Sequence, residues 1–186
     1  MRWRAMVLCI GLLASGSAVR AQDSLSVRGQ RDAQATFDVL KGLAGQWTGT
    51  VTTDPHNPDI EGAIQVTMRV AARGNVLEHE IAPGGVPEPT MIFVEGDHLA
   101  LVHYCEAGNR PRLIARGPAD PKKVDFEFAD ISGSREPLYL KDFVFTIVNA
   151  NHHVEDWTFQ MPDDQKLVAH FDLNRAAAGR SKPAGR

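Results

Sequence analysis

The sequence has little cysteine and carries none of the short motifs by which many enzymes are recognised. Cys9 lies in an apolar N-terminal stretch, so Cys105 is the lone cysteine of the remaining chain and cannot form an intramolecular disulfide there. We expect Cys105 to be buried as a small apolar residue. Nucleophile elbows, phosphate-binding loops, dinucleotide fingerprints and His-Glu-x-x-His pairs are all missing. The sequence therefore gives no catalytic class, and an enzymatic role is left open.

An excess of positive charge is also missing. The chain has 20 Lys and Arg against 23 Asp and Glu, a net charge of -3. Removing Arg2, Arg4 and Arg20, which lie in the predicted leader, leaves 17 basic residues against 23 acidic ones, about -6. An acidic surface repels phosphate backbones and anionic membranes. We expect no nucleic-acid partner and no stable membrane insertion, while the oligomeric state stays open.

The N-terminus has the pattern of a signal peptide over residues 1–21. Arg2 and Arg4 precede an apolar stretch over residues 6–14, and residues 19–21 form a plausible cleavage site before Gln22. The apolar stretch is shorter than the roughly 20 residues that span a bilayer, which makes a membrane anchor the weaker alternative. The pattern predicts export to the periplasm or the extracellular space.

The rest of the chain divides into three parts. Residues 22–34 are polar, and we expect a flexible segment. Within residues 35–43, Phe37, Leu40 and Leu43 have helical spacing, which predicts a short helix before Gly45. Residues 35–175 are expected to form one domain, and residues 176–186 a disordered tail.

Beyond Gly45 the apolar residues alternate with polar ones between regularly spaced turn residues, which is typical of strands. Ten strands are predicted, over residues 46–53, 63–71, 76–81, 90–95, 98–105, 112–116, 123–128, 141–148, 152–160 and 166–173. Residues 83–89 contain three prolines and are expected to form a loop. The short connections favour an all-β fold, a single antiparallel up-and-down β-barrel with a short N-terminal helix. A barrel of about ten strands is wider than side chains alone fill, so we expect a ligand cavity.

Residues 37–49 resemble the opening of calycin-type barrels, where a short helix leads into a Gly-x-Trp-x-Gly strand. Gly45, Trp47 and Gly49 stand in those places. The glycines are expected to let the backbone pass close to the helix, and Trp47 to close one end of the barrel. Lipocalins, fatty-acid-binding proteins and nitrobindin-like haem barrels share this opening. The strand number favours the fatty-acid-binding or nitrobindin type over the eight-stranded lipocalins.

Residues 91–112 are similar to a segment of uncharacterised exported bacterial proteins, in which a Gly-Asp hairpin leads into His-Tyr-Cys and then Gly-Asn-x-Pro-Arg. This resemblance implies a fold and an export route but no activity. The likeness to nitrobindin implies haem as an alternative cofactor, with His170 as its axial ligand and His152 and His153 as further candidates. Otherwise we predict no cofactor.

Alternation along the strands predicts which side chains enter the barrel. His79 shares a strand face with Leu77 and Ile81, and His103 shares one with Leu99 and Leu101. His153 and Glu155 share a face with Trp157. These apolar neighbours predict that the polar side chains point into the barrel. We expect Arg112 near one mouth, where it or Arg110 could meet an anionic head group. The predicted ligand-binding residues are Trp47, His79, His103, Arg112, His153, Glu155 and Trp157.

This set predicts a binding protein that holds a small apolar or amphipathic molecule inside the barrel. A structural pair, such as His103 with Glu155, is the plain alternative, because a buried polar group without a partner costs about 1–3 kcal/mol. A His/Glu pair could also serve a lyase or isomerase, and three inward histidines could bind zinc. An envelope domain without a ligand remains the last alternative.

Overall fold

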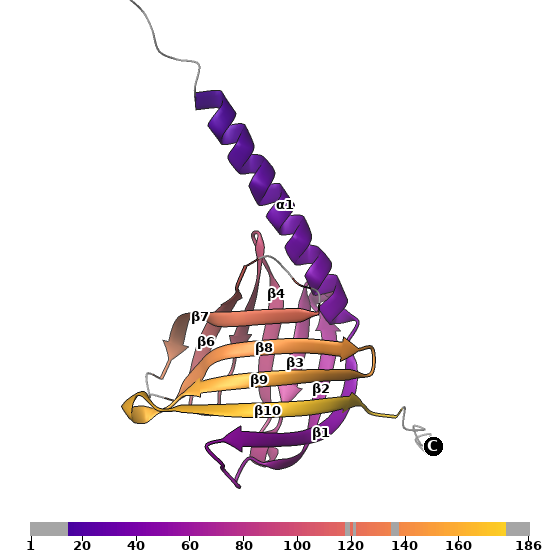
Figure 1. Ribbon diagram of the computed structural model, residues 1–186, viewed down its shortest axis with the longest axis vertical. Coiled ribbons are helices and arrows are strands. Elements are labelled where there is room, and N and C mark those ends of the chain that lie inside the picture. Colours follow the sequence, from indigo (N-terminus) through magenta and orange to yellow (C-terminus); the bar gives the residue numbers. More distant parts are fainter. Residues whose placement is uncertain (1–14, 118–119, 121, 135–137, 178–186) are drawn as a thin grey trace, which may run out of the picture.

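Ten antiparallel strands close into a barrel in the computed structural model, which describes the backbone of residues 15–117, 120, 122–134 and 138–177 and, within these, side chains from residue 26 onward. Each strand pairs with its neighbours in sequence, and β1 pairs with β10 (Figure 1). The predicted barrel and its strand number are confirmed. The elements are α1 Ser15–Lys41, β1 Gly45–Asp54, β2 Gly62–Ala71, η1 Ala72–Gly74, β3 Val76–Ile81, η2 Pro83–Gly85, β4 Glu88–Glu95, β5 His98–His103, β6 Asn109–Ala115, β7 Lys123–Gly133, β8 Tyr139–Asn149, β9 His152–Gln160, η3 Pro162–Asp164 and β10 Lys166–Arg175.

The strand bounds differ from the predicted ones mainly around the loops. The segment that includes Glu88 and Pro89 was expected to be a loop because of its prolines, but it begins β4. A proline is tolerated at the start of a strand, and the Pro89 carbonyl still accepts a hydrogen bond from the Tyr104 amide at 2.9 Å. Conversely, β5 ends at His103, so Cys105 lies in the turn before β6.

The helix is much longer than predicted. It spans Ser15–Lys41, so residues 22–34, expected to be flexible, are helical. Their apolar residues are too few to give a helical periodicity, although alanine, arginine and glutamine favour helix on their own. Figure 1 shows α1 leaving the barrel as a long rod. Of the predicted leader, residues 1–14 lie outside the described part of the chain, and so do residues 178–186 of the predicted tail.

One end of the barrel is covered by the last turns of α1, which pack near β4 and β5. Ala33, Phe37 and Leu40 are buried there, together with Leu43 beyond the helix. Among the described helices, none is long and apolar enough to cross a membrane. The opposite end is formed by the connections β1–β2, β3–β4, β5–β6, β7–β8 and β9–β10.

Gly49 allows β1 and β10 to close the barrel. A Cβ atom at this position would lie 1.8 Å from the backbone oxygen of Asp172. The sequence suggested that this glycine accommodates the helix, and this interpretation is wrong: the close neighbour is the backbone of β10. Trp47 does lie inside at the α1 end, as expected, and its indole N–H donates to the Leu43 carbonyl at 2.9 Å.

Candidate functional site

A cavity of about 420 Å³ opens at the end of the barrel away from α1. Its wall is mainly apolar, and carboxyl groups and one thiol are set into it. The lining consists of Val51, Asn57, Asp59, Ile60, Ile64, Ile81, Pro83, Gly84, Val86, Glu88, Cys105, Glu106, Leu138, Phe159, Met161, Leu167, Ala169 and Phe171. This size and character are typical of sites for small organic molecules. We call it the mouth cavity.

Glu88 is the buried carboxylate of the mouth cavity, with only 5% of its surface exposed. One carboxylate oxygen, Oε1, accepts a hydrogen bond from the Glu106 amide at 2.9 Å, and the other, Oε2, lies 3.4 Å from Nε2 of His103. Burial alone would raise the pKa of Glu88, but the contacts with His103 and the Glu106 amide bring it below its ordinary value. The cavity thus contains an anionic acceptor at neutral pH.

His103 lies directly behind Glu88 and is fully buried. Its Nδ1 is 2.9 Å from the hydroxyl of Thr90, while Nε2 has no hydrogen-bond partner among the described residues. Cys105 stands two residues further along the chain, half-buried rather than buried as predicted. Burial, opposed by a backbone amide at Ala107, raises the pKa of its thiol. One donor atom from each of Glu88, His103 and Cys105 lies within 4.8 Å of the others.

A second polar cluster lies deeper in the barrel, around the fully buried Glu155. Oε1 is 2.9 Å from Nε2 of His79 and 2.9 Å from Nε2 of His153, and Oε2 accepts the indole N–H of Trp157 at 2.9 Å. Burial by itself would raise the pKa of Glu155, but the charges and hydrogen bonds of the two imidazoles hold it well below its ordinary value. The ionised carboxylate therefore accepts three N–H groups.

Aromatic rings enclose this deeper cluster. The rings of Phe145 and His153 stack with centroids 4.8 Å apart, and Trp47 meets His153 edge-on at 4.2 Å. The predicted inward orientation of His79, His103, His153, Glu155, Trp47 and Trp157 is confirmed by their burial. However, none of these six residues lines the mouth cavity: His103 contacts the lining at Glu88, and Trp157 contacts it at Phe159 and Phe171. The pairing with Glu155 that was considered for His103 is instead made by His79 and His153.

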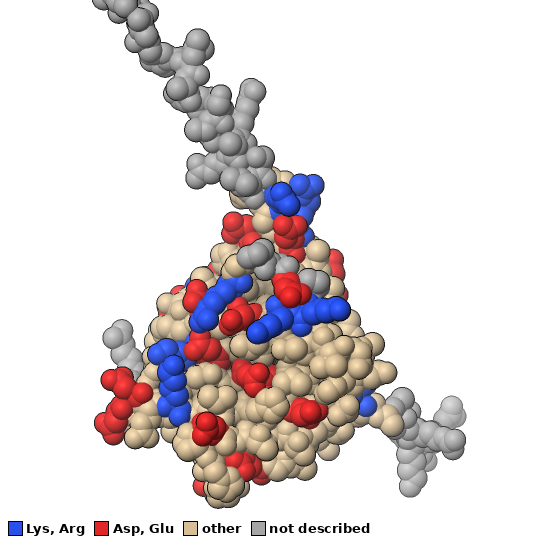
Figure 2. Space-filling view, viewed as in Figure 1, with Lys and Arg blue, Asp and Glu red and all other residues tan. Residues whose placement is uncertain are grey.

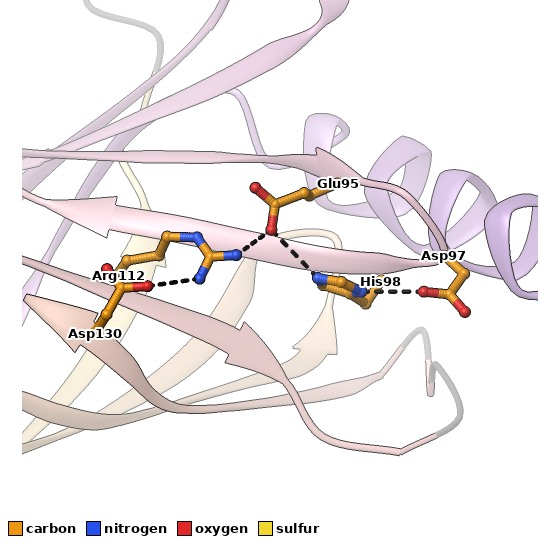
Figure 3. A network of polar contacts seen from close by, with 5 residues as sticks. All are labelled: Glu95, Asp97, His98, Arg112 and Asp130. Atoms are coloured by element: carbon orange, nitrogen blue, oxygen red, sulfur yellow. Dashed lines mark hydrogen bonds and ion pairs between the residues drawn. The ribbon is translucent and has the colours of Figure 1, made fainter.

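Arg112 lies on the outer face of the barrel, and its predicted place at a mouth is wrong. Figure 3 shows it between Glu95 and Asp130, and Glu95 also contacts His98. Alternation puts Arg112 outside because its neighbours in sequence, Pro111 and Leu113, are buried. The neighbouring Arg110 is also exposed. Opposite charges meet elsewhere on this exterior too, as where Arg116 contacts Glu127 and Asp142. Figure 2 shows basic and acidic residues interspersed over one face of the molecule.

The histidines considered as haem ligands also lie away from the mouth cavity. His170 is on the outer face of β10, where Nδ1 is 2.7 Å from Asp156. His152 likewise contacts Asp172 outside the barrel at 3.0 Å. His153 is enclosed beside Glu155. None of the three lines the mouth cavity.

The cluster of Glu88, His103 and Cys105 was not predicted from the sequence as a unit. Glu88 was assigned to a loop, and Cys105 was regarded as a buried apolar residue. The available signal was the alternation of Ile92, Thr90 and Glu88, which places all three on the inner face once β4 is extended by two residues.

Comparisons with known proteins support the fold. No protein-family model and no curated protein sequence matches the chain. Among solved structures, the chain is similar to the crystal structure of Rv2717c from M. tuberculosis, with a TM-score of 0.57 and 14% identity over 76% of this chain and 98% of that one. A redesigned β-barrel covers 73% of this chain and 93% of its own, at 15% identity and a TM-score of 0.35. The chain is thus a closed ten-stranded antiparallel barrel whose fold is consistent with a ligand-binding barrel.

Proposed function

We propose that this protein binds a small amphipathic molecule in the mouth cavity, with the apolar body of the ligand against the barrel wall and a donor group directed toward Glu88. The observation that carries the proposal is the cavity itself, a largely apolar space of about 420 Å³ with a buried carboxylate in its wall. A few polar groups in an apolar pocket orient a ligand, while the apolar contacts supply most of its affinity.

The charge of the cavity lining indicates which head groups suit the ligand. Asp59, Glu88 and Glu106 line the cavity, and no Lys or Arg is among its lining residues in the described part of the chain. Arg110 and Arg112, which we expected to meet an anionic head group, lie on the exterior. A neutral or cationic head group that donates hydrogen bonds therefore fits better than a carboxylate or a phosphate.

The proposed ligand lies at the open end of the barrel and not at its centre. Phe126, Phe145 and Trp157 are almost completely buried and fill the centre with protein, and Trp47 is buried at the α1 end. Glu155 contacts one ring nitrogen of His79 and one of His153, while Nδ1 of each imidazole has no hydrogen-bond partner among the described residues. This favours a structural role for the deeper cluster over direct ligand contact, acid–base chemistry or haem ligation. Export to the periplasm or the extracellular space, proposed from the leader, is compatible with such a carrier.

The proposal is tested with N-phenylnaphthylamine, a neutral apolar dye whose fluorescence rises on transfer from water. We expect saturable binding in the presence of a chelator, and at least about tenfold weaker binding for Ala169→Leu, because the added side chain fills the cavity. Val168→Leu, on the outer face of the same strand, is the matched control and should bind like the wild type. Equal dye affinity of Ala169→Leu and Val168→Leu would overturn the proposal, provided that both variants unfold cooperatively.

A further inference from the structure

We infer that Glu88, His103 and Cys105 form a binding site for a divalent metal ion of the zinc type, with a free coordination position directed into the mouth cavity. Carboxylate oxygen, imidazole nitrogen and thiolate sulfur are the three ligand types that zinc takes in proteins. The inference does not depend on the proposed function, because all three ligand atoms belong to the protein.

The spacing of the three donors fits a tetrahedral ion. With bonds of about 2.0–2.2 Å to nitrogen and oxygen, two ligands of a tetrahedral zinc lie about 3.3–3.5 Å apart. Nε2 of His103 and Oε2 of Glu88 are 3.4 Å apart, which is long for a hydrogen bond but suits an edge of that tetrahedron. One donor atom of each of the three residues lies within 4.8 Å of the others, so the sulfur of Cys105 has to move closer for all three to bind one ion.

A second observation is the imidazole nitrogen of His103 that faces Glu88. His103 is fully buried, and its Nε2 lies 3.4 Å from Oε2 of Glu88 but makes no hydrogen bond of normal geometry in the described part of the protein. Nδ1 of His79 and of His153 also lack partners, but among the described residues only His103 belongs to a group of three possible metal ligands. A buried polar atom is normally paired, since leaving it unpaired costs about 1–3 kcal/mol. The Thr90 hydroxyl contacts the opposite ring nitrogen at 2.9 Å. When Nδ1–H donates to this hydroxyl, the lone pair of Nε2 faces Glu88 and Cys105, as metal-binding histidines require.

The turn between β5 and β6 orients the carboxylate of Glu88 for an ion. The Glu106 amide donates to Oε1 of Glu88, which leaves Oε2 for an ion. A divalent ion that binds the sulfur of Cys105 displaces the thiol proton to solvent. Three protein ligands leave the fourth position of the ion open.

The direction of the open position follows from the cavity. Glu88 and Cys105 both line the mouth cavity, whereas His103 lies behind them. An ion held among the three is therefore reached from the cavity side, by water or by a donor group of a bound small molecule. Zinc sites with three protein ligands and one exchangeable position have this arrangement.

The experiment measures metal binding to the purified full chain after treatment with a chelator. We expect calorimetric titration with Zn²⁺ to give one site per chain, and Co²⁺ to give the near-ultraviolet charge-transfer band of a thiolate ligand. Cys105→Ser should remove that band and weaken Zn²⁺ binding by about 100-fold or more. Thr90→Val keeps the side-chain shape and all three ligands but removes the hydroxyl that orients His103, and should weaken binding about 10–100-fold.

His170→Gln is the matched control, because His170 contacts Asp156 on the outer face and should not affect either signal. Absence of a thiolate–cobalt band in the wild type would overturn the inference. Zinc affinity that Cys105→Ser and Thr90→Val leave unchanged would also overturn it. Dye binding by the chelator-treated protein is measured separately, so failure of the metal site and failure of the proposed function give different results.

Discussion

At Gly49 the closure of the barrel leaves no room for a side chain. Its backbone lies so near to β10 that a Cβ atom would be 1.8 Å from the Asp172 oxygen and 2.8 Å from the Asp172 carbonyl carbon. Both neighbours are backbone atoms, so no side-chain rotation can relieve the overlap. β1 and β10 would have to separate, which would break pairing along the closing seam.

We therefore expect Gly49→Ala to destabilise the protein by at least about 3 kcal/mol, the upper end of the usual range for overpacking. Urea unfolding followed by tryptophan fluorescence measures this as a lower midpoint. Thr48→Ala, an exposed neighbour on the same strand, should cost less than about 1 kcal/mol. Equal midpoints for the two variants would show that the seam adapts and that Gly49 is not required for closure.

For single residues, the sequence predicted correctly the properties that follow from the alternation of side chains along a strand. The inward orientation of His79, His103, Glu155 and Trp157 followed from their apolar neighbours. Alternation gives the face of a strand but not the depth along the barrel axis. It could not show that Glu155 lies deep among its own donors while His103 lies next to the mouth cavity, since that depends on the stagger between strands.

At the scale of elements, the β1–β2 connection forms one wall of the mouth cavity and is organised by Glu61. The Glu61 carboxylate accepts hydrogen bonds from the Thr53 amide at 2.9 Å, the Thr53 hydroxyl at 2.5 Å and the Asn57 amide at 3.3 Å. Chiefly because of the Thr53 hydroxyl, the pKa of Glu61 is lowered to about 2. The carboxylate therefore keeps these bonds until the pH falls toward that value.

Glu61→Ala should loosen this connection without unfolding the barrel. We expect faster amide hydrogen exchange over residues 53–61, because two backbone donors lose their acceptor. Glu80→Ala, on the outer face of β3, is the control and should leave exchange in this segment unchanged. If exchange over residues 53–61 stays at the wild-type rate, Glu61 is not what holds the wall of the cavity.

Elements were predicted well where apolar periodicity was strong and poorly where it was weak. All ten strands were found, yet the early turns of α1 were missed because they are polar. The loop assigned to Glu88 and Pro89 followed from proline content, although a proline at a strand end needs no ladder hydrogen bond of its own. Because Glu88 was assigned to a loop, it was not placed on the inner face of the barrel. The cluster of Glu88, His103 and Cys105 was therefore not predicted.

At the scale of the whole molecule, the deeper cluster links global stability to pH. The two titratable groups that face Glu155 are His79 and His153, and Trp157 supplies the third N–H. The pKa of Glu155 is lowered in the folded protein from the 4.5 of an unperturbed glutamate. A group whose pKa is lowered by folding stabilises the fold fully above its unfolded value, and this contribution declines as the pH falls below it.

Glu155→Gln should therefore be strongly destabilised near neutral pH, by about 3 kcal/mol, because an amide cannot accept three N–H groups as a carboxylate does. The difference in free energy of unfolding between wild type and Glu155→Gln should shrink as the pH falls from about 4.5 toward 3. Urea unfolding at each pH measures it. Glu127→Gln, a half-exposed partner of Arg116, should cost less than about 1 kcal/mol. A difference that stays the same down to about pH 3 would mean that the buried carboxylate is not ionised, and the two imidazoles would then have to be held in place by the surrounding aromatic rings alone.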